Sequence, residues 1–211
     1  DINLPVVDLK KIIVSPEHIH TMIDNHIATV GGDPISRATN AWNKFSNEQK
    51  GIVSYMVKEF EMRKAADEHK RTSVADTGVL NPNRLHAYKF SEDIFLKNAV
   101  VADGKNHGFI MYIDWSGSMR PSMADTIRQL MLLAMFCKKS NIPFDAFAFT
   151  NGWEEPGDET RYSDKYETGK ERDLLLPDRF RLLHLISSKV KNVQFTKQMT
   201  YLTYILGSYD W

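Results

Sequence analysis

An apolar strand, a helix and a second apolar strand follow one another in the second half of the chain, and this order constrains the fold most. Residues 109–113 form a short apolar run, which predicts a strand buried on both faces. Residues 121–138 carry apolar side chains at helical spacing, and residues 142–150 read as another strand. Because a helical crossover joins parallel strands, we predict an α/β fold with a doubly wound, mainly parallel, Rossmann-like sheet.

The flanking segments suggest three regions. We predict a helical N-terminal region over residues 1–75, a connecting segment over 76–107, and an α/β domain over 108–211 that contains a polar insertion at 151–178. Further helices are predicted within the first and last of these regions. Their ranges are 15–31, 46–71, 177–190 and a segment that begins at residue 200.

Two of these helices carry start signals. Ser15 is a cap candidate, with Pro16 at the first helical position and Gly31 or Gly32 as the stop. For the helix over 46–71, Ser46 and Gln49 fit a capping box.

The charge balance argues against a nucleic-acid binder. Lys and Arg together number 27, as do Asp and Glu, so the formal net charge is zero. The single cysteine, Cys137, excludes an intrachain disulfide and favours the reducing cytoplasm. No apolar run has the length of a membrane span, so we expect no membrane association.

A cluster of oxygen-bearing side chains follows the first apolar strand. Asp114, Ser116 and Ser118 alternate, which places them on one side of an extended chain, and Gly117 allows a tight turn. One carboxylate and two hydroxyls suit Mg²⁺, Mn²⁺ or Ca²⁺ rather than Zn²⁺. The same alternation turns Trp115 away from the ion, either into the packed interior or onto a contact surface.

Other interpretations of these residues fit less well. A phosphoaspartyl hydrolase needs a second carboxylate at the place that Ser116 occupies. A serine-hydrolase elbow needs glycines two positions before and after the nucleophile, and neither Ser116 nor Ser118 has them. The simplest alternative is that these residues only cap the following helix.

The sequence DWSGSM after an apolar strand resembles the DxSxS signature of the von Willebrand factor A (VWA) domain and its metal-ion-dependent adhesion site. The segments DTGVLNPNRLHAYKFSEDIF and FAFTNGW resemble the VWA subunit of CobT-type cobaltochelatases, which occur in bacteria and phages. The resemblance covers roughly residues 76–211.

This resemblance implies a set of metal ligands. Asp114, Ser116 and Ser118 match the first metal-binding loop, and Thr200 matches a threonine that opens a later helix, with Thr196 as the second choice. A VWA domain also has a later strand that ends in an aspartate. No apolar strand leads into Asp210, so we expect that group and the closing strands outside these 211 residues.

The resemblance also implies a function. The bound cation would capture an Asp or Glu from a partner, expected to be a MoxR/CobS-like AAA+ ATPase, and oligomers are compatible with this. Without a phosphate-binding loop of its own, the chain would be a non-ATPase subunit of a metal chelatase, with no catalytic activity alone. The alternatives are a metal-dependent hydrolase, for which His107 lies at the wrong end of the strand, and a structural protein with a vestigial site.

Overall fold

The computed structural model describes residues 9–83, 88–90, 95–101, 108–151 and 180–208. The chain divides into two compact units. The first comprises residues 1–54 and 107–211, and the second comprises residues 55–106. The boundary between them falls within one long helix, and a short strand of the N-terminal region belongs with the α/β part of the chain.

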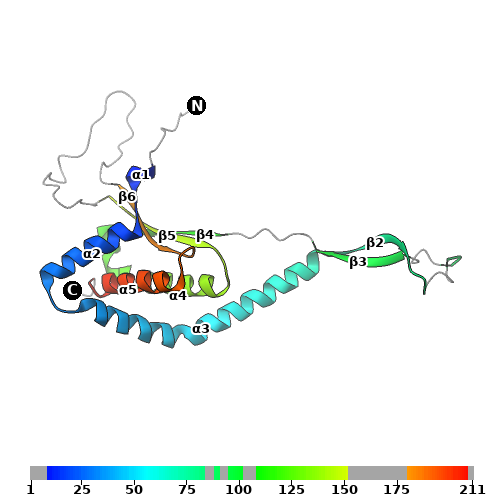
Figure 1. Cartoon of the computed structure of the whole chain (residues 1–211), viewed down its shortest axis with the longest axis horizontal. Coiled ribbons are helices and arrows are strands. Elements are labelled where there is room, and N and C mark those ends of the chain that lie inside the picture. Colours follow the sequence, from blue (N-terminus) through cyan, green and yellow to red (C-terminus); the bar gives the residue numbers. More distant parts are fainter. Residues whose placement is uncertain (1–8, 84–87, 91–94, 102–107, 152–179, 209–211) are drawn as a thin grey trace, which may run out of the picture. The chain divides into compact units, whose positions relative to one another are not determined.

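The first unit is an α/β structure built on an open mixed sheet with the strand order β1-β6-β5-β4 (Figure 1). Its strands are β1 (Ile13–Val14), β4 (Phe109–Asp114), β5 (Phe144–Thr150) and β6 (Arg181–Ser187). Strand β4 pairs with β5 and β1 pairs with β6 in parallel, whereas β5 and β6 are antiparallel. The predicted α/β class and a mostly parallel sheet are therefore confirmed.

Two helices, α4 (Met123–Lys139) and α5 (Asn192–Ser208), pack side by side on one face of this sheet (Figure 1). The apolar face of α4 is fully buried at Ile127, Ala134 and Cys137. In strand β5 the small side chains of Ala146 and Ala148 are also fully buried. Small strand residues let the helices approach the sheet closely, which explains how this face excludes water.

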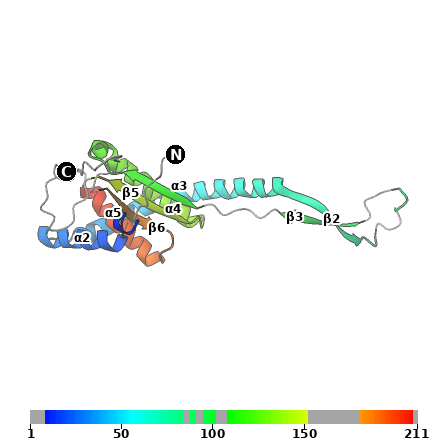
Figure 2. The same ribbon diagram turned by 90° about the horizontal axis from the view of Figure 1, so that it is seen from above.

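The N-terminal part contributes α1 (Leu9–Ile12) and α2 (Pro16–Val30). The predicted start of α2 is confirmed, because Ser15 caps it by accepting a hydrogen bond from the His18 backbone NH at 3.3 Å. Gly31 ends the helix with a φ of 77°, a backbone conformation that residues other than glycine rarely adopt. Helix α2 packs on β6 and α5 (Figure 2).

Helix α3 (Pro34–Arg71) contains the predicted helix but begins twelve residues earlier, so the capping box at Ser46 is wrong. The helix start is fixed instead by Asp33, whose Oδ1 accepts from the Ser36 backbone NH at 3.0 Å. In its first half, Trp42 is buried, with 6% of its surface exposed. This burial favours a continuous helix through residues that lack a strong apolar stripe.

The second unit contains the remainder of α3 and a two-stranded antiparallel ribbon (Figure 2). Its strands are β2 (Thr72–Leu80) and β3 (Phe95–Val101), with an irregularity between Asp76 and Leu80. Part of the predicted connecting segment is thus a hairpin.

The helix predicted over 177–190 is wrong, because residues 181–187 form β6. A register shift opposite Ala146 and Phe147 interrupts the alternation of β6, so the adjacent residues Leu185 and Ile186 are both buried. Two adjacent buried apolar residues fit the spacing of an amphipathic helix better than that of a strand, so the sequence pattern indicated a helix. The last helix is confirmed but begins at Asn192, eight residues before the predicted start.

Strand β4 is less buried than predicted. Within the described residues it pairs only with β5, and Ile110 and Tyr112 are 66% and 59% exposed. The predicted insertion at 151–178 and Asp210 lie outside the described residues, apart from Asn151. Among the described helices, none combines the length and the apolar character needed to cross a membrane.

Candidate functional site

The candidate site is the segment of residues 114–118, called here the Asp114 loop, which begins at the last residue of β4. Asp114 is the last residue of β4 and pairs with Phe149 of β5. Because the two strands are parallel, both end at the same edge of the sheet, which we call the carboxyl edge. The chain remains extended through Ser116, at φ −84° and ψ 156°, before the 3₁₀ helix η2 (Gly117–Ser122) begins.

Hydrogen bonds within the loop bring the three predicted ligands together. The backbone NH of Ser116 donates to Asp114 Oδ1 at 3.0 Å. The Oγ atoms of Ser116 and Ser118 lie 2.9 Å apart, with either hydroxyl able to donate. The loop is exposed to solvent at these contacts, so its oxygens are accessible from outside the molecule.

The donor set fits a magnesium-sized ion. Mg²⁺ takes oxygen ligands octahedrally at about 2.0–2.1 Å, so neighbouring ligands lie about 2.8–3.0 Å apart. The 2.9 Å between the hydroxyl oxygens of Ser116 and Ser118 is a hydrogen-bonding distance that is also compatible with that spacing. Asp114 Oδ1 accepts from the loop backbone, and its carboxylate would bind the ion directly or through a water molecule.

A carboxylate-rich or histidine-rich metal site is not seen in the part of the chain that the structure describes. No group of three or more His, Cys, Asp or Glu side chains is placed there to hold a metal ion. A site built from hydroxyls carries less negative charge than such a group, which leaves a bound dication under-neutralised.

Thr200 does not open a helix. It lies midway along α5 and is buried, with 5% of its surface exposed. Helix α5 follows the end of β6, where Ser187 pairs with Asp145, so α5 begins at the edge opposite the Asp114 loop. Thr196, the second choice, is exposed in the second turn of α5. The structure thus unites three of the four predicted ligands, and the role of Thr200 stays a prediction.

Gly117 is not required for an unusual backbone angle. Positive φ values are seen at Gly31, Gly32 and Asn141 among the described residues, but not at Gly117. A Cβ atom added at Gly117 would meet nothing within 4 Å. The glycine therefore leaves open space beside the hydroxyls instead of supplying the tight turn expected from the sequence.

A pocket of about 320 Å³, called here the apolar pocket, adjoins the loop through Trp115. It lies between α2, β6 and α5, and Thr150 lines it from the end of β5. Its lining is mostly aliphatic and aromatic. The lining residues are Ile19, Met22, Ile23, His26, Trp115, Thr150, Leu183, Leu185, Tyr204 and Ile205. Trp115, which the sequence predicted to turn away from the ion, lines this hollow.

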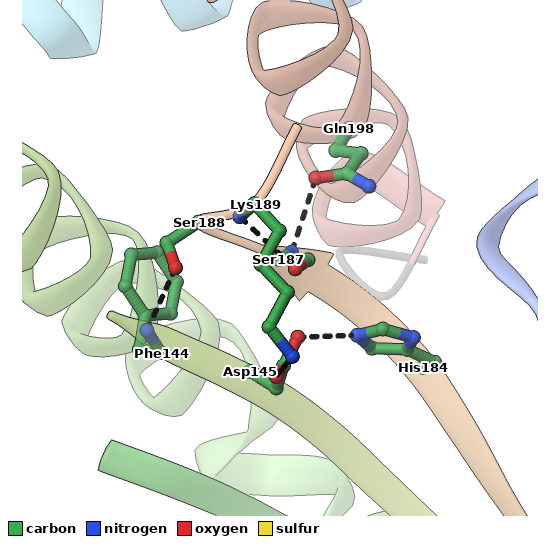
Figure 3. Close-up of polar contacts among 7 residues, drawn as sticks. All are labelled: Phe144, Asp145, His184, Ser187, Ser188, Lys189 and Gln198. Atoms are coloured by element: carbon green, nitrogen blue, oxygen red, sulfur yellow. Dashed lines mark hydrogen bonds and ion pairs between the residues drawn. The ribbon is translucent and has the colours of Figure 1, made fainter. Parts of the chain in front are cut away.

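A second polar cluster lies at the opposite edge of the sheet (Figure 3). Asp145 Oδ2 accepts from Lys189 Nζ at 3.0 Å, and Oδ1 lies 3.1 Å from His184 Nε2. Partial burial alone would raise the pKa of Asp145, but hydrogen bonds from Ser187 and Lys189, together with nearby positive charge, leave that pKa lowered. A lone carboxylate inside the otherwise apolar strand of residues 142–150 was the sequence signal for this cluster.

This second cluster secures the connection from β6 to α5. The Ser188 hydroxyl accepts from the Phe144 backbone NH at 2.8 Å, and Gln198 Oε1 accepts from the Ser187 backbone NH at 3.2 Å (Figure 3). Lys138 Nζ donates to the backbone carbonyls of Ser188 and Val190. Because all these contacts are internal, the cluster has an evident structural role.

No protein-family model matches the chain, and no curated protein and no solved structure was found to be similar to it.

Proposed function

We propose that this chain is a protein-binding module that depends on a divalent cation held at the Asp114 loop. The observation that carries the proposal is the 2.9 Å separation of the Ser116 and Ser118 hydroxyl oxygens beside Asp114, at the end of a strand. Ligands in open parallel sheets bind beyond the carboxyl ends of strands, where this loop lies.

The charge of the site indicates what it would bind. The loop offers one carboxylate and two neutral hydroxyls, so Mg²⁺ bound there keeps about one positive charge. An acidic side chain from another protein supplies both the missing charge and a further oxygen ligand. Asp114, Ser116 and Ser118 would hold the ion, which would supply the positive charge that attracts the acidic group, and Gly117 leaves open space beside them.

The finer assignment follows the resemblance of DWSGSM to VWA domains. It comprises a doubly wound VWA fold, a CobT-type role beside a MoxR/CobS-like AAA+ ATPase, a cytoplasmic setting and Thr200 as a further ligand. The open, mostly parallel sheet is compatible with this assignment.

A hydrolase at the same loop lacks support among the described residues. The pair His184 and Asp145 is the natural acid–base candidate, but it lies near the opposite edge of the sheet from Asp114. His107 lies outside the described residues. A vestigial site would predict that the loop binds no ion.

Direct measurement of metal binding tests the proposal. Titration with Mn²⁺, followed by electron paramagnetic resonance, should give one site that Mg²⁺ competes for. Asp114→Asn and Ser116→Ala should each weaken it at least tenfold. Ser122→Ala is the matched control, because that hydroxyl donates to the Met119 carbonyl and stands outside the ligand set. Equal affinity in all three variants would exclude the proposed site.

A second measurement addresses partner binding. Immobilised wild-type chain should retain a purified MoxR-type ATPase in Mg²⁺ and release it in EDTA, and Asp114→Asn should not retain it. Retention that is unchanged in EDTA would refute metal bridging. Esterase or phosphatase activity that Asp114→Asn abolishes would instead favour the hydrolase alternative.

A further inference from the structure

The apolar pocket lies at the same edge of the sheet as the candidate metal site. Trp115 lines the pocket and stands in sequence between Asp114 and Ser116. Thr150, the last residue of β5, lines it as well. Helix α5 begins at the other edge and contributes Ile205 from near its end. The pocket and the Asp114 loop are therefore neighbours in space as well as in sequence.

The pocket is an incompletely filled part of the helix layer. Met22, Ile23 and Ile205 line it and are only partly buried, although the rest of the layer includes fully buried residues such as Ile127 and Met199. Its volume of about 320 Å³ lies at the lower end of the range for binding pockets. Its aliphatic lining offers the environment that a leucine, isoleucine, methionine or phenylalanine side chain gains by leaving water.

The loop itself connects the pocket to the candidate metal site. Successive side chains of an extended segment point to opposite sides, so Trp115, which lines the pocket, is expected on the side opposite to Asp114 and Ser116. Trp115 is the immediate neighbour of both Asp114 and Ser116, and successive residues of an extended chain lie about 3.3 Å apart. We therefore expect a segment that crosses the loop to present its two contacting side chains one to three positions apart.

From these observations, and on the basis of the proposed metal site, we infer that the apolar pocket is the second half of a two-point recognition site. The partner is a protein segment that gives an Asp or Glu carboxylate to the cation and places a bulky apolar side chain in the pocket. Charge complementarity supports the contact with the carboxylate, because Asp114 alone would leave a bound cation with excess positive charge. The contact in the pocket is supported by Trp115, which belongs to the Asp114 loop and also lines the pocket.

A random-peptide library displayed on phage provides the probe. The immobilised chain is loaded with Mg²⁺, washed, and eluted with EDTA, and the eluted peptides are sequenced. We expect Asp or Glu to be enriched together with a bulky apolar residue one to three positions away. In a synthetic peptide of that motif, replacing the apolar residue by alanine should weaken binding about tenfold or more, as expected for the loss of a buried side chain.

Variants of the chain locate the apolar contact. Ile23→Ser should weaken binding of the motif peptide. It should not change the binding of the peptide that carries alanine at the apolar position. Val193→Ser is the matched control, because Val193 is 82% exposed in the first turn of α5, at the other edge of the sheet. Mn²⁺ affinity should be unchanged in both variants, which shows that the fold and the metal site are intact. The substitution within the peptide gives the same information without altering the fold.

The outcomes separate this inference from the proposed function. Peptides that are eluted by EDTA and carry an acidic residue without an apolar neighbour would overturn the inference and leave the metal site standing. Apolar peptides that resist EDTA would overturn two-point recognition, and absent Mn²⁺ binding would overturn the proposed function itself. A free small carboxylate as the natural ligand is indicated if acetate competes as well as the motif peptide does, and this too would overturn the inference.

Discussion

The Tyr201 hydroxyl donates a 2.5 Å hydrogen bond to Asp24 Oδ1 and so joins α5 to α2 across 177 positions of the sequence. His20 stacks on the Tyr201 ring at 4.0 Å between centroids. Burial, together with the bond to Asp24, raises the pKa of Tyr201, so the phenol remains protonated at all moderate pH values. This contact holds α2 against α5, and α2 contributes Ile19, Met22 and Ile23 to the lining of the apolar pocket.

Removing that hydroxyl should destabilise the first unit. Tyr201→Phe removes the donor to the Asp24 carboxylate, but Asp24 is exposed and water can replace that donor, so the loss should be that of an ordinary hydrogen bond, about 0.5–1.5 kcal/mol. We expect the free energy of unfolding, measured with urea at pH 7, to fall by about that amount. Tyr55→Phe is the control, since Tyr55 is 66% exposed and should give no measurable change. A Tyr201→Phe variant as stable as wild type would show that the contact carries no net energy.

Asp145 should stabilise the fold in a pH-dependent manner. Its pKa is lowered in the folded state, so its stabilising effect is present above the unfolded value of about 3.9 and is lost as the pH falls towards the folded value. Asp145→Asn weakens the hydrogen bonds to Lys189 and His184, so it should lower the free energy of unfolding by about 1 kcal/mol at pH 7. The difference should shrink below about pH 4.

The control for this measurement is Asp125→Asn. Asp125 contacts Arg128 at 3.0 Å, but its side chain is 76% exposed, and exposed pairs contribute little. A pH-independent effect of Asp145→Asn would assign the loss to packing rather than to charge.

Cys137 should resist modification in the folded protein. It is fully buried in α4, and burial raises the pKa of its thiol to about 11. Thiolate is the reactive form, so at pH 8 the reaction of Cys137 with a disulfide reagent should be limited by the rate of unfolding. In urea the reagent should label one thiol per chain. Because the folded pKa is raised, stability should also decline as the pH rises above about 9. Immediate labelling in native buffer would contradict the buried position.

Gly117→Ala should leave the fold intact. Gly117 has no positive φ, and an added Cβ meets nothing within 4 Å, so the free energy of unfolding should be unchanged or up to about 1 kcal/mol higher. Mn²⁺ affinity should persist, while binding of a bulky partner should weaken because the methyl group occupies open space beside the ion. A clear loss of thermal stability would show that the glycine conformation is needed after all.

Local signals determined much of the fold from the sequence. The start of α2 at Ser15, helix α4, and strands β4 and β5 follow from caps and periodicity, which act within a few residues. The cluster of Asp114, Ser116 and Ser118 could be predicted for a similar reason, because its contacts span only two residues each. The sequence predicted an extended chain throughout, whereas the structure brings Ser118 beside Ser116 through the first turn of η2.

Only the tertiary structure decided the rest. Residues 181–187 become a strand because β5 offers them an antiparallel partner, and the register shift there hides their alternation. Asp145 acquires its partners His184 and Lys189 only when β5 and β6 meet. Thr200 could be matched to a motif, but the folded chain holds it midway along α5. The apolar pocket likewise exists only where α2, β6 and α5 meet, since side chains distant in sequence can enclose a space only after the chain has folded.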